Sequence, residues 1–146
     1  MIQKDDFIGS INRKAPDGLD VHGNPYRVLV VDDSAVMRKI IIQVLKSELF
    51  EIVGEAGDGE QAVNLYKELR PHLVTMDINM PKLDGLGALK KILQHDKDAQ
   101  VIMLTSEGQK QTVVEAIAAG AKNYIVKPPE RSKVLEKINS VIRPEK

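Results

Sequence analysis

The sequence contains no cysteine and carries no excess of charge of either sign. Without cysteine the chain forms no disulfide scaffold, no thiolate metal site and no thiol nucleophile. The 21 Lys and Arg residues balance the 21 Asp and Glu residues. This balance argues against a dedicated nucleic-acid-binding protein, because such proteins usually carry a basic patch and a high pI.

The sequence also lacks a secretory signal and a long hydrophobic run. The N-terminus, "MIQKDDFIGS", has no basic start followed by an apolar segment, and no apolar run is long enough to cross a bilayer. We therefore expect a soluble, cytoplasmic protein. The 146 residues, 42% of them hydrophobic, suggest one domain that can bury a real core.

The first part of the chain differs in composition from the rest. The stretch "NRKAPDGLDVHGNP" is rich in Gly, Pro, Asn and Asp, with turn signals at "PDG" and "GNP". We predict a tail or irregular arm over residues 1–25, a regular domain over residues 26–143 and a short C-terminal end over residues 144–146. Phe7, Ile8 and Ile11 are candidates for a short docked segment, but the composition favours a flexible tail.

Strand patterns alternate with helix patterns from Tyr26 onward. Short apolar runs predict strands at 27–32, 51–56, 72–77, 99–105 and 123–127. Apolar residues at helical spacing predict helices at 35–49, 58–70, 85–95, 108–120 and 130–142. In the first of these helices, Ser34 is a candidate cap, and Val36, Ile40, Val44 and Leu45 are the expected apolar face. The alternation predicts an α/β fold with a doubly wound, five-stranded parallel sheet and helices on both faces.

Polar residues stand at the ends of four predicted strands. Asp32 and Asp33 end the first strand and Asp77 ends the third, while Thr105 and Lys127 end the fourth and fifth. In an open α/β sheet, ligands bind beyond the carboxyl ends of the strands, where the winding reverses. If the first, third and fourth strands are neighbours, these five side chains come together at the carboxyl-end edge of the sheet.

This set of residues suits phosphoryl chemistry. Clustered carboxylates need a cation, and oxygen ligands without His or Cys favour Mg²⁺, which also prefers a phosphate ligand. Lys127 and Thr105 offer a positive charge and a hydroxyl for phosphoryl oxygens, and Asp77 could become an aspartyl phosphate. A single Asp in such a place is usually a turn former or helix cap, as we expect for Asp58 and Asp84. The prediction therefore rests on the whole set.

Four sequence blocks resemble a known family. "VLVVDDS", "DINMPKLDGL", "IMLTSEG" and "AGAKNYIVKP" occur in this order, and several separated blocks are far more specific than one short motif. From Tyr26 to about Arg143 the chain resembles the response-regulator receiver domains, and among them the stand-alone, CheY-like chemotaxis regulators. The resemblance implies a flavodoxin-like sheet with strand order 2-1-3-4-5.

The resemblance also implies roles for the acidic residues. Asp77 would be the phosphoacceptor. Asp33 would bind Mg²⁺ directly and Asp32 through water, while Asn79 would offer its backbone carbonyl to the metal. Asn79 would also influence the lifetime of the phosphate.

Further roles follow for residues of the later strands and loops. Thr105 would bond to the phosphoryl group and shift when the group arrives, and Tyr124 would then turn inward. Lys127 would contact the phosphoryl group, and its peptide bond to Pro128 is typically cis in this family. Glu107 would be a second residue that tunes hydrolysis of the phosphate.

The implied function is that of a signalling switch which catalyses its own phosphorylation and dephosphorylation but is no ordinary enzyme. The implied partners are a CheA-like histidine kinase, a FliM-like flagellar motor switch protein and a CheX-, CheC- or CheZ-like phosphatase. No nucleic acid or membrane is expected, and the protein would be a monomer unless the N-terminal arm mediates association. The fourth helix, fifth strand and fifth helix would form the face that binds a partner.

Three alternatives remain open. A phosphorelay intermediate, which passes the phosphate to a histidine phosphotransfer protein, would have the same fold and site. A Mg²⁺-dependent aspartyl phosphohydrolase usually has a second Asp two residues after its nucleophile, where this chain has Asn79. A structural pseudo-receiver is disfavoured by the complete set of polar residues. Two features depart from the family pattern, namely residues 1–25 and Gly87, since glycine weakens a helix.

Overall fold

Five strands and five helices alternate along the part of the chain that the computed structural model describes, residues 15–143. The strands are β1 (Arg27–Val31), β2 (Glu51–Ala56), β3 (Leu73–Asp77), β4 (Val101–Thr105) and β5 (Asn123–Val126). The helices are α2 (Ala35–Ser47), α3 (Gly59–Leu69), α4 (Gly85–His95), α5 (Lys110–Ala119) and α6 (Arg131–Ile142). Phe7, Ile8 and Ile11, the candidates for a docked segment, lie outside the described residues.

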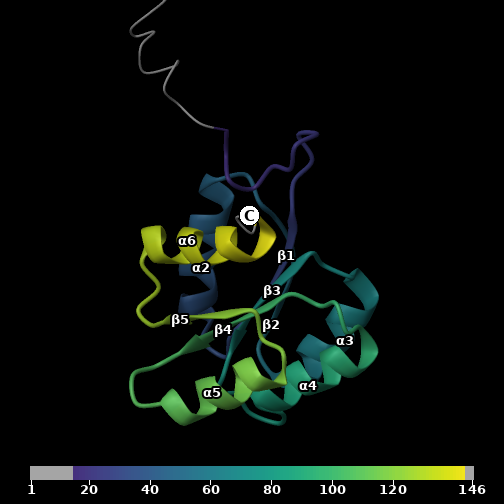
Figure 1. Cartoon of the computed structure of the whole chain (residues 1–146), viewed down its shortest axis with the longest axis vertical. Helices are drawn as coiled ribbons and strands as arrows, with labels where there is room; N and C mark the ends of the chain where they lie inside the picture. Colours follow the sequence, from purple (N-terminus) through teal and green to yellow (C-terminus); the bar gives the residue numbers. More distant parts are fainter. Residues whose placement is uncertain (1–14, 144–146) are drawn as a thin grey trace, which may run out of the picture.

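The strands form one sheet in the order β2-β1-β3-β4-β5, and every neighbouring pair is parallel (Figure 1). The predicted fold class and strand order are therefore confirmed. β3 lies at the centre of the sheet, and all five of its residues are buried. Parallel strands buried on both faces are expected to be nearly continuous apolar runs, as "LVTM" is before Asp77.

Helices cover both faces of the sheet (Figure 1). Alternate strand residues point to opposite faces, so Val28 and Val30 of β1 pack with Ile41 and Leu45 of α2 and with the apolar side of α6. Leu29 and Val31 face the other way, toward α3, α4 and α5. None of the helices between residues 15 and 143 is long and apolar enough to cross a membrane.

The apolar face of α2 differs from the predicted one. Ser34 caps the helix as expected, since its side chain accepts a hydrogen bond from the Met37 backbone N–H at 3.1 Å. Leu45 is buried as predicted and Val44 packs against the core, but the other fully buried residue is Ile41. Val36 is 69% exposed and Ile40 is 39% exposed. Three consecutive isoleucines offer two overlapping stripes, and packing against α6 and the sheet selects the stripe that contains Ile41.

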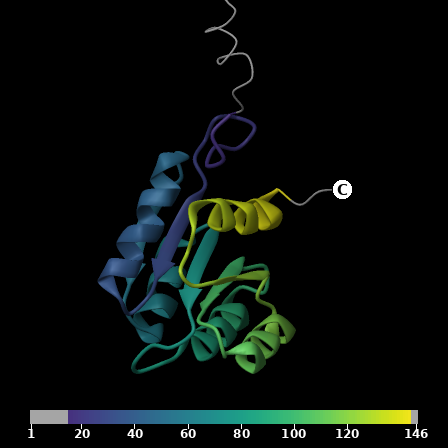
Figure 2. The same cartoon turned by 90° about the vertical axis from the view of Figure 1, so that its left-hand side faces the viewer.

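Residues 15–25 fold into a loop that lies against the end of the sheet where β1 begins (Figures 1 and 2). The Gly18 N–H donates to the Glu48 carbonyl oxygen at 2.7 Å, and the Tyr26 N–H donates to the Gly18 carbonyl oxygen at 2.8 Å. A Cβ atom on Gly18 would lie 2.3 Å from the Glu48 carbonyl oxygen and the Phe50 backbone nitrogen. Only glycine allows the two chain segments to approach this closely.

The same loop contacts the C-terminal end of α6. The Asn139 amide donates to the Asp17 carboxylate at 3.0 Å. The Arg143 guanidinium donates to the Leu19 carbonyl oxygen at 2.6 Å, and it lies 5.4 Å from the centre of the Tyr26 ring. The loop therefore joins the last helix to the corner between α2 and β2.

Candidate functional site

The ends of β1, β3 and β4 place polar side chains where little solvent reaches them. Asp32 follows β1 and is fully buried, Asp77 ends β3 and is 5% exposed, and Thr105 ends β4 and is 3% exposed. Parallel strands share one direction, so their carboxyl ends lie at the same edge of the sheet. Asp33, one residue further along, is exposed.

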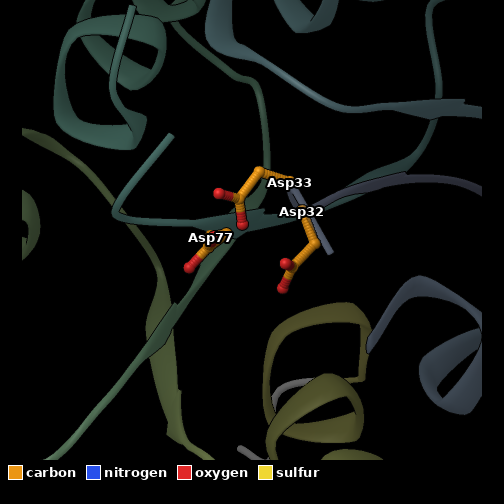
Figure 3. Close-up of side chains that lie close together, drawn as sticks. All are labelled: Asp32, Asp33 and Asp77. Carbon is orange, nitrogen blue, oxygen red and sulfur yellow. The ribbon is translucent and has the colours of Figure 1, made fainter. Parts of the chain in front are cut away.

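Three carboxylates meet at this edge (Figure 3). Asp32, Asp33 and Asp77 each offer one oxygen atom, and these atoms all lie within 4.8 Å of one another. Like charges this close repel each other, and burial strengthens the repulsion because the surroundings screen it less. The cluster therefore needs a positive charge nearby.

Lys127, from the end of β5, supplies one such charge. Its Nζ atom lies 3.1 Å from Asp32 Oδ2 and 3.1 Å from Asp77 Oδ1, and it donates a hydrogen bond to Asp77. The contact with Asp32 is an ion pair whose geometry falls short of a hydrogen bond. The peptide bond between Lys127 and Pro128 is cis.

The charges shift the pKa values of the site. Burial raises the pKa of Asp77 from 3.8 to about 6, opposed by the hydrogen bond from Lys127 and reinforced by the neighbouring charges of Asp32 and Asp33. Burial by itself would lower the pKa of Lys127, but the attraction of the nearby Asp32 and Asp77 carboxylates outweighs burial and raises that pKa. Lys127 therefore stays positively charged at neutral pH, whereas the pKa of Asp77 lies closer to neutral pH than its usual value.

The donor set fits a hard divalent cation such as Mg²⁺. It consists of carboxylate oxygens, which Mg²⁺ prefers over softer ligands. Within residues 15–143 the buried Asp32 Oδ2 accepts no hydrogen bond, and it is paired with Lys127 Nζ at 3.1 Å. Lys127 brings one positive charge to three carboxylates, and a divalent cation bound among the three aspartates would balance the remaining negative charge.

The loop after β3 shapes the same edge. The Gly85 N–H donates to the Ile78 carbonyl oxygen at 2.7 Å, and a Cβ atom on Gly85 would lie 2.1 Å from the Asp77 carbonyl oxygen. The start of α4 therefore approaches the backbone of Asp77 closely, a contact that requires glycine. Asn79 lies exposed in this loop, two residues after Asp77.

The remaining predicted residues lie around the β4–α5 loop and on β5. The Thr105 hydroxyl hydrogen-bonds within this loop, at 3.2 Å from Gln109 Oε1 and 3.1 Å from the Ser106 carbonyl oxygen. Glu107 is exposed in the loop. Tyr124 is 36% exposed on β5 and does not point into the core, since Lys137 Nζ lies 5.1 Å from the centre of its ring.

Two residues near the site were not predicted from the sequence. Arg38 donates to the Asp32 carbonyl oxygen at 2.6 Å and to the Glu55 carboxylate at 2.9 Å, so it holds the end of β1 from the first turn of α2. An Arg on the polar side of a helix carries no signal for such a role. Gln109 follows Thr105 by four residues in a loop without periodicity, and no pattern distinguishes it from its neighbours.

Comparison with known proteins agrees with this geometry. The response regulator receiver domain family matches residues 28–139. The chain is 51% identical over 145 residues to the chemotaxis protein CheY of Treponema pallidum, covering 98% of this chain and 100% of that one. It is also 51% identical over 117 residues to the chemotaxis protein CheY of Bacillus subtilis, covering 80% of this chain and 98% of the relative.

A similar solved structure is the crystal structure of the CheX–CheY–BeF3–Mg²⁺ complex from Borrelia burgdorferi. One chain of that complex shares 43% sequence identity, with a TM-score of 0.84, and the match covers 87% of this chain and 97% of the other. The sequence match, the strand order and the acidic edge of the sheet agree. This chain belongs to the response regulator receiver domain family.

Proposed function

We propose that this protein is a single-domain chemotaxis response regulator in which Asp77 accepts a phosphoryl group from a histidine kinase in a Mg²⁺-dependent reaction. The observation that carries the proposal is the environment of Asp77. It is a buried carboxylate at the end of the central strand, with a pKa raised to about 6, beside Lys127 and two further carboxylates. The CheY relatives support the link to chemotaxis.

The residues of the site have complementary roles in this reaction. Asp77 is ionised above about pH 6, and its carboxylate attacks the phosphorus of a phosphohistidine while the P–N bond breaks and the imidazole nitrogen keeps the electron pair. Lys127, 3.1 Å from Asp77 Oδ1, neutralises charge on the phosphoryl oxygens. The Asp32, Asp33 and Asp77 carboxylates with the Asn79 backbone carbonyl would hold Mg²⁺. When bound, the ion supplies further positive charge for the phosphoryl oxygens.

Phosphorylation would then act as a switch between two packings of the same fold. The Thr105 hydroxyl moves to the phosphoryl group and Tyr124 turns inward, which changes the face formed by α5, β5 and α6. Asn79 and Glu107, both exposed beside the site, influence how fast water removes the phosphate. Self-phosphorylation from small donors and autodephosphorylation belong to the same proposal.

The proposed partners act on this one site or on this one face. They are a CheA-like kinase, a FliM-like motor switch protein and a CheX-, CheC- or CheZ-like phosphatase, and the complex of CheX with CheY from Borrelia burgdorferi supports a CheX-like partner. We propose that the protein acts as a monomer in the cytoplasm. Residues 26–143 would form the receiver domain, preceded by an arm over residues 1–25.

Acetyl phosphate tests the proposal directly. The protein is incubated with acetyl phosphate and Mg²⁺, and its intact mass is read beside that of Asp77→Asn. We expect a phosphate adduct that is stable to acid and labile to base, absent from the variant and absent when EDTA removes the metal. An unmodified wild-type protein in the presence of Mg²⁺ would refute the assignment of Asp77 as phosphoacceptor.

A further inference from the structure

The side chain of Gln109 folds back over the β4–α5 loop. Its Oε1 atom lies 3.2 Å from the Thr105 hydroxyl and 2.9 Å from the Ser106 backbone nitrogen. Gln109 also occupies the N-cap position of α5, where its side chain makes no capping bond. The side chain is therefore used to hold the loop instead of the first turn of the helix.

The direction of these hydrogen bonds follows from the Ser106 N–H. A backbone N–H can only donate, so the Gln109 atom that faces it must be the carbonyl oxygen and not the amide nitrogen. The same oxygen faces the Thr105 hydroxyl and can only accept, so in the hydrogen bond between them the hydroxyl is the donor. The Ser106 carbonyl oxygen, in the same loop and 3.1 Å from the hydroxyl, shares this single proton with Gln109.

A phosphoryl group on Asp77 would be a competing acceptor for this proton. Phosphoryl oxygens accept hydrogen bonds and do not donate them, and the hydroxyl has one proton to give. The Thr105 side chain must therefore leave Gln109 before it can bond to the phosphoryl group. A cavity of about 310 Å³, lined by Thr105, Gln109, Val113, Tyr124 and Val126 among others, gives both side chains room to separate.

We propose that Gln109 is a latch that holds the Thr105 hydroxyl away from the phosphorylation site and so sets how readily the protein switches. This inference rests on the proposed phosphorylation of Asp77. Gln109 is a positioning residue, because it acts through Thr105. The backbone carbonyl oxygen of Gln109 accepts the Val113 N–H of α5 at 3.0 Å, so the residue that holds Thr105 is itself fixed to the first turn of α5.

Two substitutions of Gln109 should move the switch in opposite directions. Gln109→Leu keeps the size of the side chain but has no acceptor, so the state with Thr105 turned toward Asp77 becomes easier to reach. Gln109→Glu offers a charged acceptor, which makes a stronger hydrogen bond, so that state becomes harder to reach. If Gln109 only stabilised the fold, both variants would lower Tm and would not shift the switch in opposite directions.

Beryllofluoride, which stands in for the phosphoryl group on Asp77, provides the readout. Its binding to the protein with Mg²⁺ is titrated by ¹⁹F NMR, and Tm is recorded for each variant. We expect Gln109→Leu to bind beryllofluoride roughly twofold to tenfold more tightly than wild type, the effect of one hydrogen bond. We expect Gln109→Glu to bind it more weakly by a similar factor.

The exposed Gln111 provides matched controls. Gln111→Leu and Gln111→Glu make the same chemical changes two residues away, so they report the effect of apolarity and of added charge alone. The latch is refuted if both Gln109 variants shift binding in the same direction, or if neither differs from its Gln111 counterpart. If wild type binds beryllofluoride but the Gln109 variants bind it no differently from their Gln111 counterparts, the latch is overturned and the proposed function stands.

A second readout keeps the latch testable if wild type binds no beryllofluoride, a result that would count against the proposed function. The rotamer populations of Thr105 are measured by three-bond NMR couplings in the unliganded protein. The latch predicts one dominant rotamer in wild type and in Gln109→Glu, and a mixture in Gln109→Leu. Identical populations in all three proteins would overturn it.

Discussion

Replacement of Asp77 by asparagine should stabilise the metal-free protein at neutral pH but not in acid. Asparagine has nearly the shape of a protonated aspartate and cannot ionise, so Asp77→Asn removes the cost of a buried charge. Asp77 is 5% exposed, and burial raises the pKa of its carboxyl group from 3.8 to about 6. A neutral side chain at this position avoids that cost at every pH.

The sign and size of the effect follow from proton linkage. Because the folded-state pKa lies above the unfolded-state value, the folded protein binds this proton more tightly. The stability that this group contributes is complete below about pH 4, and it is lost as the pH rises through about 6. Each pKa unit corresponds to about 1.4 kcal/mol, so Asp77→Asn should gain about 3 kcal/mol over wild type between pH 4 and pH 7.

Urea unfolding in EDTA at a series of pH values measures this gain. The difference in unfolding free energy between Asp77→Asn and wild type should grow from about pH 4 and level off above about pH 6. Asp98→Asn, at an exposed position, should show no such growth. Excess Mg²⁺ should reduce the gain, because a bound cation stabilises the ionised carboxylate. A stability difference that stays constant with pH would refute the reasoning.

Three further substitutions test other parts of the structure. Lys127→Met leaves the buried carboxylates without their cation, so the metal-free protein should lose about 3 kcal/mol of unfolding free energy in urea. Added Mg²⁺ should reduce this loss. A loss that does not change with Mg²⁺ would contradict a site at which Lys127 and the metal neutralise the same carboxylates. Gly18→Ala should release the loop from Glu48, seen as faster hydrogen exchange of the residue 18 N–H; unchanged exchange would show that the contact is not tight. Tyr66→Phe removes the hydrogen bond to Asp96, 2.8 Å long, and should cost about 1 kcal/mol in thermal unfolding, whereas an unchanged Tm would mean that this bond adds nothing.

The order of elements could be predicted because their boundaries are chemically marked. Ser34, Asp58 and Asp84 each accept a backbone N–H at the start of a helix, and Gly120 ends α5 with a φ of 125°. Such caps depend on neighbouring residues only. The buried face of α2 could not be predicted in the same way, because adjacent isoleucines leave the choice of face to the packing of α6 and the sheet.

The candidate site was predictable to the extent that it lies at strand ends. Asp32, Asp77 and Thr105 follow from the direction of the strands. The bridge from Lys127 to two carboxylates, by contrast, depends on the spatial position of β5. The latch of Gln109 depends on the path of a loop, which no periodic pattern describes. The individual roles of the acidic residues came from the resemblance to a family and not from their spacing.

The contacts of residues 15–25 have a consequence for when this segment can fold during synthesis of the chain. Asp17 and Leu19 bond to Asn139 and Arg143, which leave the ribosome more than a hundred residues later. Loops that close over such sequence distances form late in folding. The first described part of the protein to be synthesised must therefore wait for the last helix before it gains its full set of partners, and a nascent chain stalled before α6 would lack this closure.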